Sequence, residues 1–226
     1  MKIAVLTGAG MSAESGLKTF RDSNGLWEGH DVMEVASPQG FINNPELVLD
    51  FYNQRRRQLL EVTPNEAHFA LANLEKDYEV AIITQNVDDL HERAGSSHVV
   101  HLHGELLKVR STYDTNTILD WRSDLNVGDL CEQQHQLRPH IVWFGESVPL
   151  MEVAINLVEK SDVVIIVGTS MQVYPAAALI QYASSTSNIY FVDPKPSIGS
   201  SEKITVIAEN ATKGVPMVIE SIRKLY

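Results

Sequence analysis

Lys2-Ile3-Ala4-Val5-Leu6 runs directly into Thr7-Gly8-Ala9-Gly10-Met11-Ser12-Ala13. The first stretch is apolar and is ended by glycines, as expected for a strand buried on both faces of a sheet. The second stretch has the G-x-G-x-x-A spacing, in which glycines permit a tight turn and let backbone amides approach a pyrophosphate. We expect this turn to open a helix whose positive N-terminus binds that group. Glycine-rich turns also serve packing, so a purely structural alternative remains open at this point.

Similar apolar runs recur along the chain, and helical patterns lie between several of them. Alternation of strand and helix predicts an α/β fold with a Rossmann-like, doubly wound parallel sheet. The predicted strands are Lys2–Leu6, Val80–Thr84, Val99–Leu102, His140–Phe144, Val163–Val167, Ile189–Val192 and Ile204–Ile207. The helical patterns are Glu66–Leu74, Met151–Glu159 and Ala176–Ala183.

Two stretches interrupt the alternation and predict a smaller lobe beside the sheet. Glu28–Val62 has a helical pattern, with Pro38 and Pro45 as helix-start signals. Leu106–Pro139 is polar and irregular, with weak strand character at both ends. We therefore expect a Rossmann-like domain of residues 1–27, 63–105 and 140–226, and a small lobe of residues 28–62 and 106–139.

Composition limits the partners and the cellular setting. The chain has 226 residues and a formal net charge of -11, which argues against nucleic acid as a partner because phosphates bind clustered Lys and Arg. No apolar stretch approaches the roughly 18 residues needed to span a bilayer. The single cysteine, Cys131, excludes an intrachain disulfide, and no secretion signal is visible. These features predict a cytoplasmic protein without membrane or nucleic-acid partners. We expect a monomer.

Polar side chains follow three of the predicted strands. These segments are Gln85-Asn86-Val87-Asp88, Val100-His101-Leu102-His103-Gly104 and Gly168-Thr169-Ser170. Open α/β sheets bind ligands at the carboxyl ends of their strands, so we expect the three segments to share one site. Asn86 or Asp88 could instead cap a helix. His103 can act as a general base near neutral pH, although a histidine at a strand end is often structural.

Five motifs in this order resemble the sirtuin family, over nearly the whole chain. They are Gly8-Ala9-Gly10-x-Ser12-x-x-Ser15-Gly16-x-x-x-Phe20-Arg21, Thr84-Gln85-Asn86-x-Asp88-x-Leu90-His91, His103-Gly104-Glu105, Pro139-His140-x-Val142-x-Phe144-Gly145-Glu146 and Gly168-Thr169-Ser170. The resemblance implies an enzyme that consumes NAD to remove acyl groups from protein lysine. It also makes His103 the expected catalytic base, which deprotonates a ribose hydroxyl.

The resemblance implies roles for further residues. Asn86 and Asp88 would act in catalysis by holding the carboxamide of nicotinamide, and Gln85 would hold the ribose. The remaining cofactor-binding residues would be Gly8, Ala9, Gly10, Ser12, Ala13, Phe20, Arg21, Trp27, Val87, Gly168, Thr169, Ser170, Asp193, Pro194, Lys195 and Ala211. The acylated protein or peptide would lie against Val142 and Phe144, and would pair with the backbone at Gly145 and Glu146 as an added strand.

Tyr52 and Arg55 predict which acyl group the protein removes. They are three residues apart in a helical pattern, so they share a face. A phenol and a guanidinium in an acyl pocket would bind a carboxylate through charge-assisted hydrogen bonds. The pair is similar to that of sirtuins that remove succinyl or malonyl groups. The alternative is a solvated basic helix face, because Arg55 begins a run of three arginines.

The chain departs from the family where many members bind a structural zinc. Ser111-Thr112-Tyr113-Asp114 stands where the first Cys-x-x-Cys pair is expected, and only Cys131, near His135, remains of the second. One cysteine and one histidine do not make a tetrahedral site, so we expect no zinc. Packing should then hold the lobe, through residues such as Tyr113, Ile118, Leu119, Trp121 and Leu125.

The chain departs from the family at two further positions. Lys18 replaces a usual proline, and Asp193 stands where the family commonly uses asparagine for the adenosine ribose. An aspartate there should favour NAD over NADP.

The same NAD site could serve mono-ADP-ribosyl transfer or NAD hydrolysis, and a catalytically silent NAD-binding module is the rival from another class. Loss of turnover in a His103→Tyr variant would separate an enzyme from such a module.

Overall fold

The computed structural model describes residues 1–18, 26–27 and 29–225. Its larger lobe is built on a six-stranded parallel sheet with the order β11-β10-β9-β1-β4-β5, which confirms the predicted Rossmann-like fold. The strands β4 and β5 follow one another on one side of β1, whereas β9, β10 and β11 follow one another on its other side. Such a switch point in strand order places a crevice at the carboxyl ends of the strands. The strands are β1 (Lys2–Thr7), β4 (Glu79–Thr84), β5 (Val99–His101), β9 (Val163–Val167), β10 (Asn188–Val192) and β11 (Ile204–Ile207).

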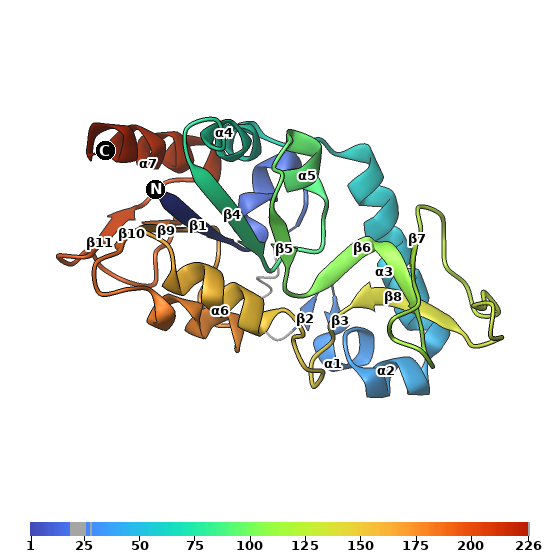
Figure 1. Cartoon of the computed structure of the whole chain (residues 1–226). Helices are drawn as coiled ribbons and strands as arrows, with labels where there is room; N and C mark the ends of the chain where they lie inside the picture. The colour runs from blue at the N-terminus through green and yellow to red at the C-terminus, as the bar shows by residue number, and fades with distance from the viewer. Residues whose placement is uncertain (19–25, 28, 226) are drawn as a thin grey trace.

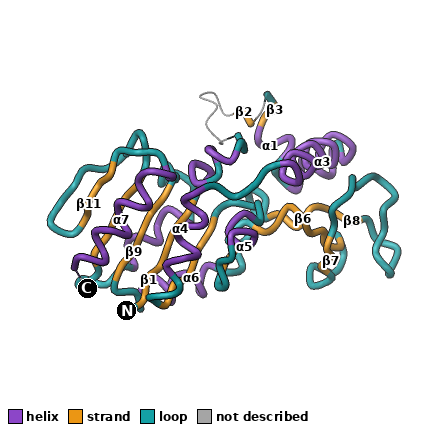
Figure 2. Tube along the Cα trace, turned by 90° about the horizontal axis from the view of Figure 1, so that it is seen from above, coloured by secondary structure: helices purple, strands orange, loops and turns teal. Residues whose placement is uncertain are grey.

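Helices cover both faces of this sheet (Figures 1 and 2). α4 (Glu66–Leu74) and α7 (Ala211–Leu225) pack on one face, and α6 (Met151–Glu159) and η3 (Ala176–Tyr182), a 3-10 helix, pack on the other. Alternate residues of a strand point to opposite faces, so a strand covered on both sides must be apolar throughout. β1 shows this directly, because Ile3 and Val5 belong to one core cluster and Ala4 and Leu6 to the other. None of the described helices combines the length and the apolar composition that a membrane span requires.

The prediction of a parallel strand at His140–Phe144 was wrong. The strand β8 (Leu137–Ile141) belongs instead to a three-stranded antiparallel sheet with β6 (Gly104–Ser111) and β7 (Ile118–Asp120), in the order β7-β6-β8. A short β-branched run has the same composition in either sheet, so its local pattern could not assign it. The predicted domain boundaries stay a prediction.

The helices of the small lobe begin where the prolines predicted. α2 (Pro38–Asn43) and α3 (Pro45–Glu61) each start with proline, and α1 (Val32–Val35) precedes them. The Ser37 and Asn44 side chains accept hydrogen bonds from backbone amides of the first turn, at 2.9 and 3.1 Å, so both act as N-caps. A short hairpin of β2 (Leu26–Trp27) and β3 (His30–Asp31) was not predicted, because two-residue strands leave no periodicity to read.

The apolar core of the outer small lobe differs from the expected set. Leu125 is fully buried and Trp121 packs against its cluster, as expected. Tyr113, Ile118 and Leu119 were expected to pack but are exposed. Ile118 and Leu119 lie in β7, at the edge of the small sheet, and all three residues of this strand are exposed. The core is formed instead by Leu49, Val109, Leu125, Cys131 and Leu137, with Phe41 and Trp121 packed against it.

A buried polar network ties the irregular segment of this lobe to α3. The Arg56 guanidinium donates to the carbonyl oxygens of Leu106 and Ser123, at 3.1 and 3.3 Å, and to Asn53 Oδ1 at 2.7 Å. Asn53 in turn donates to the Leu125 carbonyl oxygen at 3.0 Å and accepts from its amide at 2.9 Å. Hydrogen bonds to a charged group contribute about 1.5–3 kcal/mol each, so this network is a substantial internal tether.

Candidate active site

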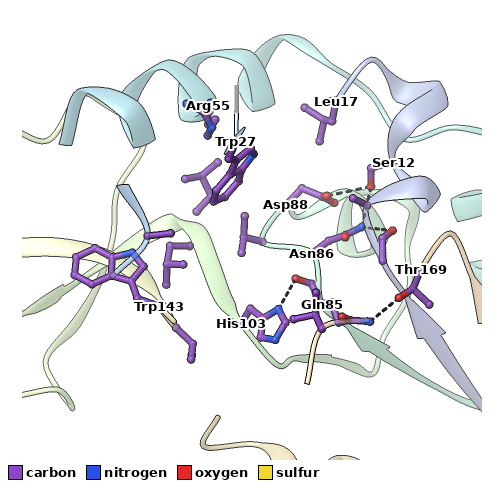
Figure 3. A pocket seen from close by; sticks show the side chains of 18 of the residues that line it. Ser12, Leu17, Trp27, Arg55, Gln85, Asn86, Asp88, His103, Trp143 and Thr169 are labelled. Atoms are coloured by element: carbon purple, nitrogen blue, oxygen red, sulfur yellow. Dashed lines mark hydrogen bonds between the residues drawn. The ribbon is translucent and has the colours of Figure 1, made fainter. Parts of the chain in front are cut away.

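A cavity of about 310 Å³ lies where the carboxyl ends of the parallel strands meet the small lobe. It brings together residues from all five sequence motifs and from α3 (Figure 3). The sequence-predicted residues that line it are Gly8, Ala9, Gly10, Ser12, Trp27, Tyr52, Arg55, Gln85, Asn86, Val87, Asp88, His103, Val142, Phe144, Gly145, Glu146, Gly168, Thr169 and Ser170.

The glycine-rich turn after β1 does not open an α-helix, so that expectation was wrong. Two short 3-10 helices follow instead, η1 (Ala9–Met11) and η2 (Ala13–Ser15). The turn is held against the end of β9, because the Gly10 amide donates to the Gly168 carbonyl oxygen at 2.8 Å. Gly168 has φ +61°, and a Cβ there would lie 2.3 Å from the Met11 nitrogen. Only glycine therefore allows the two loops to approach this closely.

Asn86, Ser12 and Asp88 form one hydrogen-bonded group at the inner wall of the cavity (Figure 3). The Asn86 side-chain amide donates to the Gly8 carbonyl oxygen at 3.1 Å and to Ser12 Oγ at 3.2 Å. Ser12 Oγ donates to Asp88 Oδ2 at 3.0 Å. Burial raises the pKa of Asp88 to about 6, although these hydrogen bonds favour the charged carboxylate. The site therefore holds a carboxyl group that titrates close to physiological pH.

The N-cap position of α5 (Leu90–Ala94) is Asp89, whose side chain makes no capping hydrogen bond, but Asp88 bonds to the first amide of this helix. Asp88 Oδ1 accepts from the Leu90 amide at 3.2 Å. The helix amide thus engages one carboxylate oxygen of Asp88, while Oδ2 belongs to the group with Ser12. Gln85 is oriented differently, since its side-chain amide donates to Thr169 Oγ1 at 3.2 Å and so bridges β4 to the loop after β9.

His103 lies at the turn that leads from β5 into β6. Gly104 makes this turn with φ +84°, where a Cβ would collide with the His140 carbonyl oxygen at 2.0 Å. His103 Nδ1 lies 3.1 Å from the Gln85 carbonyl oxygen, and because a carbonyl only accepts, Nδ1 must carry the hydrogen. In the neutral ring the lone pair is therefore on Nε2. Burial lowers the pKa of His103, with the hydrogen bond to Gln85 opposing, so the ring is neutral at pH 7.

The other histidine of this segment, His101, holds the neighbouring loop. Its Nδ1 lies 3.2 Å from the Asn86 carbonyl oxygen and its Nε2 lies 2.6 Å from Glu92 Oε1. Both partners are acceptors, so both ring nitrogens donate. Burial alone would lower the pKa of His101, but the hydrogen bond and the charge of Glu92 raise it above its ordinary value. His101 therefore supports the backbone at Asn86 from outside the cavity.

Tyr52 and Arg55 lie at the small-lobe end of the cavity, on one face of α3. The Arg55 guanidinium lies over the Phe51 ring, 3.2 Å from its centroid, and 5.4 Å from that of Trp27. One of its nitrogens also donates to the Phe51 carbonyl oxygen at 2.5 Å. Both side chains line the cavity, and the Arg55 side chain is partly buried. Arg57 behaves differently, because it pairs with Asp124 on the surface at 2.6 Å.

The segment after β8 forms another wall. Val142 and Phe144 line the cavity, and Trp143 between them is buried in the small lobe. The Glu146 side chain accepts hydrogen bonds from Arg110, Arg138 and the Trp143 amide, so it fixes the loop that contains Gly145.

Several predicted cofactor residues do not line the cavity. Ala13 lies in η2, and Ala211 is buried at the start of α7. Asp193, Pro194 and Lys195 follow β10 at the same sheet edge, where the Asp193 carboxylate accepts from the Lys195 amide at 2.8 Å. Phe20 and Arg21 lie outside the described residues.

The cavity also contains residues that sequence reasoning did not select. Trp143 carried a usable signal, because it is a tryptophan inside a recognised motif. The others are mostly apolar and resemble ordinary core positions, so nothing in the sequence distinguished them. They are Leu17, Lys18, Ala36, Gln58, Leu59, Leu106, Ile141, Trp143, Val148, Val173, Tyr174 and Pro175.

The residues at the expected zinc position do not converge as ligands. The Cys131 thiol lies 3.4 Å from Ser111 Oγ, whereas the His135 ring stacks on Tyr113 with centroids 4.3 Å apart. Within residues 1–18, 26–27 and 29–225, no group of three or more His, Cys, Asp or Glu side chains is placed to hold a metal ion. The absence of zinc from the protein stays a prediction.

Comparisons with known proteins agree with this geometry. The model of the Sir2 family matches residues 8–175. An NAD-dependent protein deacylase of Helicobacter pylori is 59% identical over 223 residues, covering 96% of this chain and 95% of that protein. Another, of Bacteroides thetaiotaomicron, is 52% identical over 220 residues, covering 94% of each. The crystal structure of a Sir2 homologue in complex with NAD has a TM-score of 0.88 and 38% identity, covering 99% of this chain and 90% of that one. The chain belongs to the Sir2 family.

Proposed function

We propose that this NAD-dependent protein deacylase of the Sir2 family removes acidic acyl groups, succinyl and malonyl, from lysine in preference to acetyl. The observation that carries the proposal is that Arg55 and Tyr52, on one face of α3, both line the cavity. A guanidinium there can bind the distal carboxylate of a succinyl or malonyl group through two parallel hydrogen bonds. An acetyl group ends in a methyl and offers no acceptor.

The described residues fit NAD at the opposite end of the cavity. Asn86 and Asp88 are nearly buried polar side chains in a largely apolar wall, which suits the carboxamide of nicotinamide. Gln85 and Thr169 offer amide and hydroxyl groups to a ribose. When bound, NAD supplies the ribose carbon from which nicotinamide departs and the hydroxyl groups that receive the acyl group.

His103 supplies the base for this chemistry. Gln85 fixes the hydrogen on Nδ1, so Nε2 is the atom that takes a proton from a ribose hydroxyl. Its lowered pKa keeps Nε2 unprotonated at neutral pH. Val142 and Phe144 give an apolar wall for the four-carbon stem of lysine and keep water from the reacting groups.

The pH dependence of the reaction is expected to reflect Asp88. Asp88 accepts most strongly from the nicotinamide amide as a carboxylate, and its pKa of about 6 means that protonation begins just below neutrality. Burial lowers the pKa of His103 below its ordinary value, so this ring is neutral at pH 7. We expect kcat/KM for NAD to be flat from pH 7 upward to pH 8 and to fall below about pH 6. An Asp88→Asn variant should be slower at every pH and should no longer show the fall in kcat/KM at acidic pH. If the variant showed the same acidic fall, the assignment to Asp88 would be contradicted.

The acyl preference is tested with one peptide in two forms, succinyl-lysine and acetyl-lysine, each incubated with and without NAD. Mass spectrometry should show NAD-dependent loss of succinyl, faster than loss of acetyl, with O-succinyl-ADP-ribose as product. Faster removal of acetyl would refute the acyl preference and leave the deacylase. No change in either peptide, with NAD consumed, would favour ADP-ribosyl transfer or NAD hydrolysis.

We also propose that the small lobe functions without structural zinc. The Arg56–Asn53 network supports this, because it joins α3 to Ser123 and Leu125, in the segment between β7 and β8. The nucleophile comes from the substrate and the cofactor, so the reaction itself requires no metal ion.

A further inference from the structure

Trp143 donates a hydrogen bond to Tyr52, and this bond restricts the orientation of the phenol hydroxyl. The indole Nε1–H donates to the Tyr52 hydroxyl oxygen at 2.9 Å, and both side chains are almost completely buried. An indole nitrogen is a donor only, so the phenol oxygen must be the acceptor in this pair. The Tyr52 hydrogen is therefore left to point elsewhere, and no other described residue accepts it.

The indole is itself fixed in place by charged groups behind it. The Arg138 guanidinium lies 3.3 Å from the Trp143 ring centroid. Arg138 and Arg110 both bind the Glu146 carboxylate, at 2.7 and 3.0 Å, and this carboxylate also accepts from the Trp143 backbone amide at 2.8 Å. The ring and its backbone are thus held by the same partly buried ion cluster, which limits rotation of the donor.

Burial also keeps the phenol protonated. Desolvation raises the pKa of Tyr52, so its hydroxyl retains a hydrogen throughout the working pH range. Tyr52 lines the cavity next to Arg55. The oxygen of this phenol already accepts a hydrogen bond from the indole, and the phenol keeps its own hydrogen, so it has a hydrogen to donate to a ligand in that cavity.

We propose that Trp143 is a positioning residue for acyl recognition, whose indole N–H directs the Tyr52 hydroxyl hydrogen toward the carboxylate of the acyl group. This rests on the proposed preference for acidic acyl groups. A carboxylate accepts that hydrogen, whereas the methyl of an acetyl group leaves it without an acceptor, which costs free energy in a buried site. Trp143 therefore contributes to selectivity without contacting the reacting atoms.

The test is a double-mutant cycle on Trp143→Phe and Tyr52→Phe, with kcat and KM measured for the succinyl and acetyl peptides. Trp143→Phe keeps a ring but removes the donor. We expect it to raise KM for the succinyl peptide about tenfold, the loss of one such hydrogen bond, with a smaller change for the acetyl peptide. In the Tyr52→Phe background it should have little further effect on the succinyl peptide, because its partner oxygen is already gone.

Trp121→Phe is the matched control. The Trp121 indole donates to the Asp124 carbonyl oxygen at 3.2 Å in the outer small lobe and does not line the cavity. This variant loses an indole hydrogen bond of similar length and should retain the succinyl-to-acetyl ratio of the wild type. Thermal melting of each variant is measured to establish that its fold is intact.

A second readout does not depend on substrate. The Trp143 Nε1–H signal in a ¹H–¹⁵N spectrum, identified by its loss in Trp143→Phe, should move upfield in Tyr52→Phe and stay in place in Trp121→Phe. An unmoved signal would overturn the inference. So would equal effects of Trp143→Phe with and without Tyr52, in an enzyme that prefers succinyl. If the wild type has no succinyl preference, the proposed function fails, and this inference fails with it.

Discussion

Replacing His103 by tyrosine is expected to lower deacylation by about 10²–10⁴-fold, the usual contribution of a general base. The physical reason is that His103 Nδ1 is committed to the Gln85 carbonyl oxygen, which leaves Nε2 as the atom that can take a proton. Tyrosine has an ordinary pKa near 10 and offers no comparable acceptor at pH 7. The measurement is NAD-dependent release of the acyl group, followed by mass spectrometry.

His98→Tyr provides the matched control for this variant. His98 is exposed just before β5 and does not line the cavity, so the same substitution there should leave the rate unchanged. His103→Tyr should still be stabilised thermally by NAD, because Asn86, Asp88 and the glycine turn remain in place. Retention of more than about a tenth of wild-type turnover would contradict a role for His103 as base.

Arg55→Met is expected to lower kcat/KM for the succinyl peptide by about 10²–10³-fold, and for the acetyl peptide much less. Two charge-assisted hydrogen bonds to a carboxylate in a partly buried site contribute roughly 3–4 kcal/mol, which corresponds to that range. Methionine keeps an unbranched apolar side chain but removes the guanidinium that lies over Phe51 and Trp27. Comparison with the acetyl peptide separates the lost carboxylate contact from this lost packing, because the packing is common to both substrates. Rates on both peptides are compared under the same NAD concentration.

Arg57→Met removes a guanidinium two residues away and serves as control. The Arg57 side chain is 53% exposed and forms a surface ion pair with Asp124, an interaction that contributes little to stability. We expect this variant to keep both activities. Equal losses on the succinyl and acetyl peptides in Arg55→Met would refute the acidic-acyl preference and assign Arg55 a structural role in α3.

The sequence predicted the elements that depend on local patterns. Runs such as Val163–Val167 are β-branched throughout, a composition that favours a strand covered on both faces. Pro38 and Pro45 marked helix starts because proline fixes φ and lacks the amide hydrogen that a first turn leaves unused. The position of His103 beside Gly104 was likewise visible, since strand ends and glycines are local features.

Only the tertiary structure decided the contacts between distant segments. The tether from Arg56 to Ser123, and the bond from Trp143 to Tyr52, join residues 67 and 91 positions apart, and neither leaves a periodic signature. The same limit explains why the strand at His140–Phe144 was assigned to the wrong sheet, since its composition suits either one. It also explains the glycine turn, which fits closely against Gly168 and is followed by 3-10 helices in place of the expected helix. Hydrophobic periodicity encodes which face of an element is buried. It does not encode which partner covers that face, because that choice depends on shape and hydrogen bonding across the whole fold.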